Sequence, residues 1–360
     1  MRHCSKKIVA AAFFSAAAIC LSGISVYAED KEPDIYREPA LSGVTRTWVY
    51  AGDDWDETVS RNRIFADDLE DGDLTTKVIR TGTIDTEKPG TYRLTYTITD
   101  SDQHTTSMET TVNVLEKGDT SEKLVQRKLY TLGSASHLTS IGFNRGYYHD
   151  RQSLGFYLPA GGELEIRLVN ADEFGKDLNI GFYNLDQEHE NRETIPASGE
   201  WVTLSNSYGV ASVPFIQTPK ENRVQPELEY KWTDELKEIP YYRYGDDEDR
   251  FFDRWSDSQA PFAILEGSAA TFLVPIKDKD NIVNSSYTRV PEYRFQSIDE
   301  MLEWYADFVK QYDEFAGLDF YADEPYNQNI RGKFFIKANV NGAGAAYYGS
   351  DHSAFNGDSL

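Results

Sequence analysis

The segment 332–349 carries the residues whose types and order best suit the binding of a peptide. Residues 334–340 have the pattern of a β-strand, and a run of small residues and two tyrosines follows them. Backbone with almost no side chains lets another chain approach an exposed strand edge and pair with it. We therefore predict a substrate-binding edge strand formed by Gly342, Ala343, Gly344, Ala345, Ala346, Tyr347 and Tyr348. An ordinary glycine-rich turn is the alternative for the same residues, and it is the interpretation that the pattern alone favours.

No motif for hydrolytic chemistry accompanies this segment. The histidines after residue 28 are His104, His137, His149, His189 and His352. No two of them are four residues apart, and the sequence contains neither His-Glu-x-x-His nor Gly-x-Ser-x-Gly. The pairs His149-Asp150 and Asp351-His352 offer single contacts at best. We assign no catalytic residue and no metal ligand to this chain.

A run of aromatic and charged residues over 241–255 is a second candidate for binding. It holds the acidic stretch 246–249 between tyrosines and the sequence Arg250-Phe-Phe-Asp-Arg-Trp255. Aromatic faces combined with carboxylates and arginines can bind sugars. The alternative, an acidic loop between buried aromatic anchors, is the interpretation that we favour.

Strands are expected to position these segments over most of the chain. Residues 91–99 and 108–114 alternate apolar and polar side chains, which predicts two strands of a small β-sandwich over 41–116. Residues 154–158 and 163–169 flank the turn 159–162 and predict a hairpin. Further strands are expected over 178–182 and 201–204.

One long helix is expected near the end of the chain. Ser297 and Glu300 have the spacing of a capping box, and Gly317 suits the C-terminal end. The apolar residues between them recur at helical spacing and predict packing against the core: Ile298, Met301, Leu302, Tyr305, Phe308, Val309, Tyr312 and Phe315.

The segments on either side of the small sandwich are predicted to be a signal peptide and two linkers. Residues 1–28 have the basic, apolar and small-residue regions of a secretory signal peptide, with a retained anchor as the alternative. The polar stretches 29–40 and 117–128 are expected to be linkers. Both cysteines, Cys4 and Cys20, lie in the signal peptide, so disulfides and thiolate zinc sites are not expected after its cleavage.

The charge of the chain excludes some partners. Removing the three basic residues of the signal peptide leaves 33 Lys and Arg against 60 Asp and Glu, a net charge of −27. Such a surface disfavours nucleic acid and anionic membrane. We expect an exported protein, secreted or at the cell surface, with no membrane insertion after signal cleavage.

The region 41–116 resembles bacterial surface Ig-like modules. The strings that carry the resemblance are Asp71-Gly-Asp-Leu-Thr75 and Pro89-Gly-Thr-Tyr-Arg-Leu-Thr-Tyr96. Such modules act as spacers or adhesive units. A calcium ion at the acidic run is one interpretation, and a solvated acidic loop is the favoured one because regular ligand spacing is absent. The run comprises Asp67, Asp68, Glu70, Asp71 and Asp73.

Most of the remaining chain resembles the enhancin-like peptidases, peptidase family M-sixty. The strings that carry this resemblance occur in the family's order over about 125–360. They are Leu154-Gly-Phe-Tyr-Leu-Pro-Ala-Gly-Gly-Glu163, Ala260-Pro-Phe-Ala-Ile-Leu-Glu-Gly267, the helix from Trp304 to Leu318, and Gly342-Ala-Gly-Ala-Ala-Tyr-Tyr-Gly349. The resemblance implies a secreted zinc metallopeptidase of the gluzincin kind that acts on mucins or other glycoproteins. It also implies that the segment around 342–348 is the substrate-binding edge.

The zinc-binding motif of that family is absent from the 360 residues. The resemblance places the His-Glu-x-x-His helix after Leu360, so zinc is implied for the family but has no ligand here. We expect an N-terminal portion that is catalytically incomplete, which leaves enzymatic activity of this chain uncertain. A non-catalytic adhesin or glycan-binding protein is the alternative. A bare 29–360 chain is expected to expose its apolar helix stripe and to dimerise or dissolve poorly.

These observations together predict a mostly β protein with some α. An Ig-like β-sandwich is expected first, then a β-sandwich subdomain that leads into an incomplete α+β catalytic subdomain of the gluzincin type. The predicted organisation is a signal peptide over 1–28, a linker over 29–40, the Ig-like domain over 41–116, a linker over 117–128, a β-rich subdomain over 129–275 and the start of the catalytic subdomain over 276–360.

Overall fold

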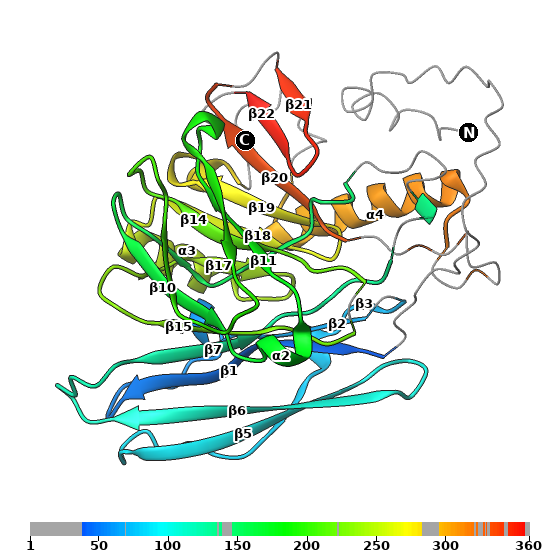
Figure 1. Cartoon of the computed structure of the whole chain (residues 1–360). Coiled ribbons are helices and arrows are strands. Elements are labelled where there is room, and N and C mark those ends of the chain that lie inside the picture. Colours follow the sequence, from blue (N-terminus) through cyan, green and yellow to red (C-terminus); the bar gives the residue numbers. More distant parts are fainter. Residues whose placement is uncertain are drawn as a thin grey trace.

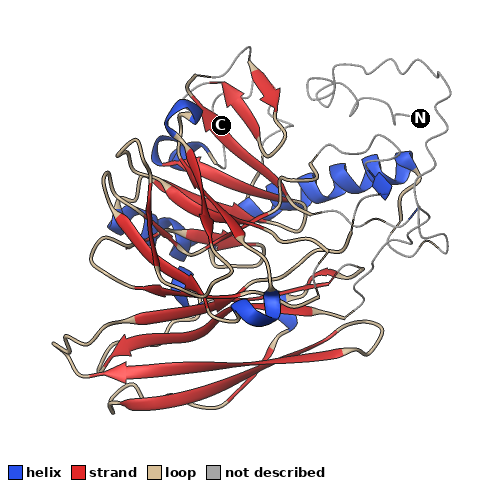
Figure 2. Ribbon diagram, in the orientation of Figure 1, coloured by secondary structure: helices blue, strands red, loops and turns tan. Residues whose placement is uncertain are grey.

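Strands form most of the described protein, as Figure 2 shows. The computed structural model describes residues 38–68, 70–134, 137–138, 146–221, 223–282, 295–319, 322, 327, 329, 332–341 and 345–356. The predicted signal peptide over 1–28 and most of the linker over 29–40 lie outside these residues. None of the helices in the described part is long and apolar enough to cross a membrane.

The Ig-like region contains the two predicted strands over 91–99 and 108–114, which pair as a β-hairpin. Strands β5 (Gly90–Thr99) and β6 (Thr105–Leu115) pair antiparallel from Gly90↔Val114 to Thr99↔Thr105. The period-2 alternation holds, because Leu94, Tyr96 and Ile98 are buried on one face. The other strands and 3-10 turns are β1 (Ala40–Tyr50), β2 (Ile64–Asp68), β3 (Gly72–Asp73), β4 (Ile79–Thr81), η2 (Ser60–Asn62) and η3 (Thr75–Lys77).

One sheet continues from the Ig-like region into the rest of the protein. Residues 117–128 were expected to be a linker, but Leu124–Lys128 form strand β7, which pairs antiparallel with β1 and with β15 (Glu227–Lys231). Val125 and Arg127 are buried while their neighbours are not, so this short segment has the alternation of a strand. Eight strands of the resulting ten-stranded sheet follow the order β13-β10-β15-β7-β1-β6-β5-β4, with β10 (Glu163–Leu168) and β13 (Val202–Ser205) at its far side. The other two are β2, which pairs with β1, and β3, which pairs with β2.

A second sheet packs on the β13-β10-β15-β7 part of the first. Its order is β12 (Asn191–Ile195), β11 (Leu178–Tyr183), β14 (Val213–Gln217) and β8 (Arg151–Ser153). The core between the sheets includes Leu164, Ile166, Leu168, Ile180, Phe182, Ile216 and Leu228. Short helical turns α2 (Ala171–Phe174) and η4 (Gln187–His189) connect these strands.

The predicted hairpin over 154–169 is wrong. Strand β9 (Phe156–Tyr157) pairs with β16 (Lys237–Glu238), whereas β10 pairs with β13 and β15. The turn itself is present, since Gly162 N donates to Pro159 O at 2.9 Å. The turn carries the chain from one sheet to another. The apolar alternation on either side of the turn predicts strands but does not specify their partners, so β9 and β10 can pair with other strands.

A six-stranded sheet forms the C-terminal part. Its order is β17 (Tyr241–Arg243), β18 (Phe262–Glu266), β19 (Ala270–Pro275), β20 (Phe334–Asn339), β22 (Ser353–Asn356) and β21 (Ala346–Tyr348). One face packs on helices α3 (Glu248–Ser258) and α4 (Ile298–Ala316), and η5 (Ile276–Asn281) follows β19. The other face packs on β11 and β14 through Tyr183, Phe215 and Phe335. Figure 1 shows β20–β22 at the end of the molecule opposite β5 and β6.

Helix α4 begins and ends as the sequence predicts. Ser297 Oγ accepts from Glu300 N at 3.0 Å, and Gly317 ends the helix with φ +79°. The Glu300 carboxylate accepts from Gln296 N at 2.6 Å, one residue before the usual capping-box donor. Core packing is confirmed for the first half of the apolar stripe, where Ile298 and Leu302 are buried. It is wrong for the end of the stripe, because Phe315 is 91% exposed.

Candidate functional site

Strand β21 is the outermost strand of the six-stranded sheet in the described part of the chain. Ala346, Tyr347 and Tyr348 pair antiparallel with Phe355, Ala354 and Ser353 of β22. Ala345 and Ala346 are exposed. The other predicted residues of this edge, Gly342, Ala343 and Gly344, lie outside the described residues.

The hydroxyl of Tyr347 points into the protein. It lies 2.6 Å from His352 Nε2, donates to Gln187 Oε1 at 2.6 Å and accepts from Asn339 Nδ2 at 3.0 Å. Burial raises the pKa of Tyr347. These three contacts tie the edge strand to β20 and to the turn η4. Only its ring and backbone are therefore left for contact with a ligand.

The turn between β21 and β22 is fixed by charges. His352 Nδ1 lies 2.9 Å from Asp351 Oδ1, Arg192 binds Asp351 Oδ2, and Arg151 donates to the Asp351 carbonyl. Burial favours the neutral carboxyl, but the His352 hydrogen bond and the Arg151 and Arg192 charges outweigh it and lower the pKa of Asp351. A Cβ at Gly349 would lie 2.9 Å from the His352 carbonyl oxygen, so this turn requires glycine.

His149 contacts both the edge strand and the turn that follows it. Its ring stacks on Tyr348 with centroids 4.9 Å apart, and its Nε2 lies 3.2 Å from Gly349 O. Because a carbonyl oxygen can only accept, Nε2 carries the proton of the neutral ring. Burial lowers the pKa of His149 to about 4. The histidine is therefore a neutral structural donor rather than a charged group at neutral pH.

A cavity of about 330 Å³ lies beside this turn. Its charged residues are Arg151, Arg192 and Asp351. The neutral residues that line it are Tyr148, Asn179, Ile180, Gly181, Tyr183, Phe215, Gln217 and Ser350. The edge strand and the cavity thus share the turn 349–352, which makes them one continuous candidate site.

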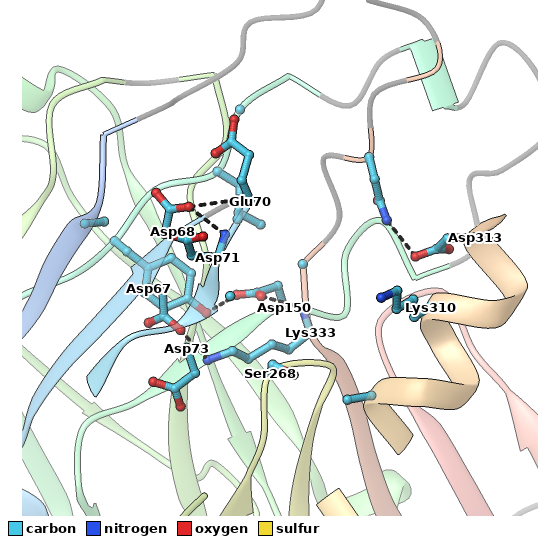
Figure 3. A pocket seen from close by; sticks show the side chains of 18 of the residues that line it. Asp67, Asp68, Glu70, Asp71, Asp73, Asp150, Ser268, Lys310, Asp313 and Lys333 are labelled. Atoms are coloured by element: carbon cyan, nitrogen blue, oxygen red, sulfur yellow. Dashed lines mark hydrogen bonds and ion pairs between the residues drawn. The ribbon is translucent and has the colours of Figure 1, made fainter. Parts of the chain in front are cut away.

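A larger cavity, of about 550 Å³, lies between the Ig-like region and α4. Figure 3 shows the acidic run of β2 and β3 on one side of it and Asp313 with Lys310 on the other. Its acidic lining residues are Glu38, Asp67, Asp68, Glu70, Asp71, Asp73, Asp150, Asp307, Asp313, Glu314 and Asp319.

The acidic run that suggested calcium has protein partners instead. Asp67 and Asp73 each lie 2.7 Å from the guanidinium of Arg243, which is 1% exposed. Glu266 and Lys333 complete this buried cluster (Figure 3 labels Lys333). The charges of Asp67 and Asp73 outweigh burial and raise the pKa of Arg243 well above its ordinary value. Asp68 accepts from the backbone of Glu70 and Asp71.

The donor groups of the described residues do not fit the zinc that the resemblance implies. Among the described residues no group of three or more His, Cys, Asp or Glu could hold a metal ion. His149 Nε2 and both ring nitrogens of His352 contact groups of β21 and of the β21–β22 turn. We therefore route no chemical step through a metal in this chain.

Four aromatic side chains of the segment 241–255 are buried, whereas Tyr244 is 38% exposed and Phe252 is partly buried. Tyr241, Tyr242, Phe251 and Trp255 are at most 6% exposed and pack in the cores of the six-stranded sheet. The aromatic-anchor interpretation is therefore confirmed for these four rings. They offer no face for the stacking of a sugar.

Sequence reasoning missed Arg151 and Arg192. They lie 200 and 159 positions before Asp351, and nothing in their local sequence marks them. The sequence gave only a weak signal for this region. The pair His149-Asp150 directly precedes Arg151, and the pair Asp351-His352 lies in the turn.

Comparison with known proteins shows two kinds of relative. Residues 39–114 match the family described as bacterial surface protein, Ig-like domain. The viral-enhancing factor of Pseudalatia unipuncta granulosis virus is 25% identical over 207 residues, which is 56% of this chain and 21% of that protein. This chain therefore spans about a fifth of the length of the curated relatives that it matches.

Solved structures are similar in fold. A functionally unknown conserved protein, a mutant, from Bacillus anthracis str. Ames superposes with a TM-score of 0.51 at 8% identity, over 65% of this chain and 45% of that one. The catalytic module of the metalloprotease ZmpA from Clostridium perfringens superposes with a TM-score of 0.48 at 14% identity, over 64% and 48%.

The chain therefore joins a bacterial surface Ig-like domain to a region that is similar to part of the viral-enhancing factors, which we call the enhancin-like region. The predicted fold class, mostly β with an Ig-like sandwich followed by a second sandwich and an α+β part, is confirmed.

Proposed function

We propose that this chain is the substrate-binding N-terminal part of a secreted zinc metallopeptidase that acts on mucins or other glycoproteins. The observation that carries the proposal is the edge strand β21, which is exposed at its first residue, Ala346, and is held in place by contacts of its two tyrosines with His352 and His149. The similarity to the viral-enhancing factors supports the family-level relation from which this function was expected.

The mechanism assigned to this chain is binding by β-augmentation. An extended peptide of the substrate adds to the free side of β21, and the main-chain hydrogen bonds supply affinity without demanding particular side chains. Rigid support matters because a strand that is already ordered loses less entropy on binding. The contacts of Tyr347 with His352, Gln187 and Asn339 provide that order.

Catalysis by the 360 residues alone is not part of the proposal. No His-Glu-x-x-His motif occurs in the sequence, and the described histidines are committed to the β21–β22 turn or lie apart. Zinc and the general base would come from elsewhere in the functional protein. Robust proteolysis by this chain that a chelator abolishes would overturn this statement.

The test uses proline at two consecutive positions of the edge. Alternate residues of an edge strand point their N–H groups outward, so either Ala345→Pro or Ala346→Pro removes an outward donor that a bound peptide needs. We expect one of the two variants to lose at least about tenfold in affinity for a mucin glycopeptide, measured by calorimetry. A matched control is Thr105→Pro at the start of β6, far from the site.

The alternative, a non-catalytic adhesin, predicts glycan binding that does not depend on β21. Equal affinity of both proline variants and the unchanged chain for the glycopeptide, with all variants folded, would favour it and contradict the proposal.

A further inference from the structure

The cavity beside the β21–β22 turn has a local charge opposite to that of the protein. The whole chain carries a formal net charge of −24, and the larger cavity is lined by eleven carboxylates against two lysines. The small cavity has two arginines and a single aspartate. We propose that this cavity is a subsite for a carboxylate group of the substrate. The proposal rests on the proposed function, since it assumes that substrate lies along β21.

Arg151 forms a fixed cationic wall of the cavity. Its side chain is 2% exposed, and its guanidinium lies 4.5 Å from the ring centre of Tyr183 and 4.4 Å from that of Phe335. Nε donates to His149 O at 2.9 Å, and Nη2 donates to Tyr148 O at 3.2 Å and to Asp351 O. Nη1 has no hydrogen-bond partner among the described residues. A preorganised guanidinium with a spare donor is suited to an anion.

Arg192 supplies the solvent-exposed part of the subsite. It projects from β12, its side chain is 64% exposed, and its Nη2 binds Asp351 Oδ2. Asp351 neutralises one of the two positive charges and orients Arg192 over the cavity. One positive charge is left over, which an incoming carboxylate can balance.

The neutral residues that line the cavity suit the polar groups of a ligand that bears this carboxylate. Asn179 and Gln217 bring amide groups, which both donate and accept hydrogen bonds, and Tyr148 is 51% exposed. Hydroxyl and amide groups of an acidic sugar such as sialic acid, or the backbone of an acidic peptide residue, both match this lining. Ser350 and Asp351 lie two and three residues after the end of β21, so either group would be held close to a chain on the edge strand.

The experiment uses the 360-residue chain and two matched pairs of small probes. The pairs are sialyllactose with lactose, and an acetylated tetrapeptide containing Glu with the same peptide containing Gln. We expect at least one carboxylate probe to bind at least about fivefold more tightly than its neutral partner, and added salt to weaken it. Selectivity in the sugar pair identifies an acidic sugar, and selectivity in the peptide pair identifies an acidic residue. Equal binding within both pairs overturns the proposal.

A charge-matched pair of variants localises the effect. Arg192→Gln removes the exposed arginine of the cavity and should lower the affinity for the selected probe at least about fivefold. Arg93→Gln removes an arginine that is 73% exposed in the Ig-like domain and should leave the affinity unchanged. Unchanged binding by Arg192→Gln also overturns the proposal.

Mucin before and after sialidase treatment separates this proposal from the proposed function. Selective binding of a carboxylate probe with no binding of either mucin retains the subsite and overturns the proposed function. Binding of mucin without any selectivity in the small probes overturns the subsite and retains the proposed function.

Discussion

His149 makes the stability of the site depend on pH. The folded protein keeps its imidazole neutral, since burial lowers its pKa to about 4 from 6.5. The unfolded chain protonates the ring as the pH falls below 6.5, and the folded chain does not until about pH 4. The contribution of His149 is therefore complete above pH 6.5 and is lost as the pH falls from there to about 4.

This residue gives the first prediction. When the pH is lowered from 7.5 to 5, the titration of His149 should reduce the unfolding free energy by about 2 kcal/mol. His149→Gln keeps a hydrogen-bond donor but does not titrate, so its unfolding free energy should fall less over this range. Urea denaturation of both proteins at the two pH values checks this. Identical losses in the two proteins would show that the folded state also protonates His149.

Tyr347 gives the second prediction at the residue scale. Tyr347→Phe removes the hydroxyl that bonds to His352, Gln187 and Asn339, and it leaves buried polar groups of His352 and Asn339 without that partner. The expected loss is about 2 to 3 kcal/mol of unfolding free energy. Tyr208→Phe is the control, because Tyr208 is 52% exposed. Equal stability of the two variants would mean that the Tyr347 hydroxyl contributes little.

Among the elements, strands with local signals were predictable and strands with distant partners were not. The alternation over 91–99, the strand pattern over 334–340 and the caps Ser297 and Gly317 identified β5, β20 and α4. Strand β7 was missed because its flanking sequence is polar and its partner β1 lies about 80 residues earlier. The hairpin over 154–169 was misassigned because a turn motif does not specify which strands pair.

The candidate site, too, was only partly predictable from the sequence. The edge strand followed from a contiguous run of small residues before two tyrosines, part of which the structure describes as β21. The cavity beside it depends on Arg151 and Arg192 meeting Asp351 across most of the chain. No local pattern encodes such a contact, so only the folded structure could place it.

Helix α4 gives a prediction about self-association. Trp304, Tyr312 and Phe315 are 44%, 39% and 91% exposed, and their spacing puts them on one stripe of the helix. An exposed apolar stripe favours association. We expect the chain to dimerise with increasing concentration in sedimentation velocity, and Phe315→Gln to weaken the dimer. A monomer at all concentrations would contradict this.

At the scale of the whole molecule, the Ig-like domain is part of one continuous sheet. Strand β1 pairs with β7, which pairs with β15 of the enhancin-like region. Buried charges strengthen the same junction, since Arg243 of β17 binds Asp67 and Asp73 of the Ig-like domain. An Ig-like module joined in this way is a rigid extension of its neighbour.

This junction yields a prediction for unfolding. Arg243→Met leaves Asp67, Asp73 and Glu266 close together with Lys333 as the remaining cation of the cluster, so we expect a loss of about 3 kcal/mol or more. Arg80→Met breaks an exposed ion pair with Glu57 and should cost less than about 1 kcal/mol. Denaturant titrations followed by tryptophan fluorescence compare the two. Equal losses would show that the junction charges are not critical.

The central claim is that substrate binds along β21, and hydrogen–deuterium exchange of the chain with and without a mucin glycopeptide tests it most directly. The account predicts slower exchange of the amides at 345–348 when the glycopeptide is bound, with the β5–β6 hairpin unchanged. Unaltered exchange at 345–348 under conditions where the glycopeptide is bound would place the substrate elsewhere and contradict the account.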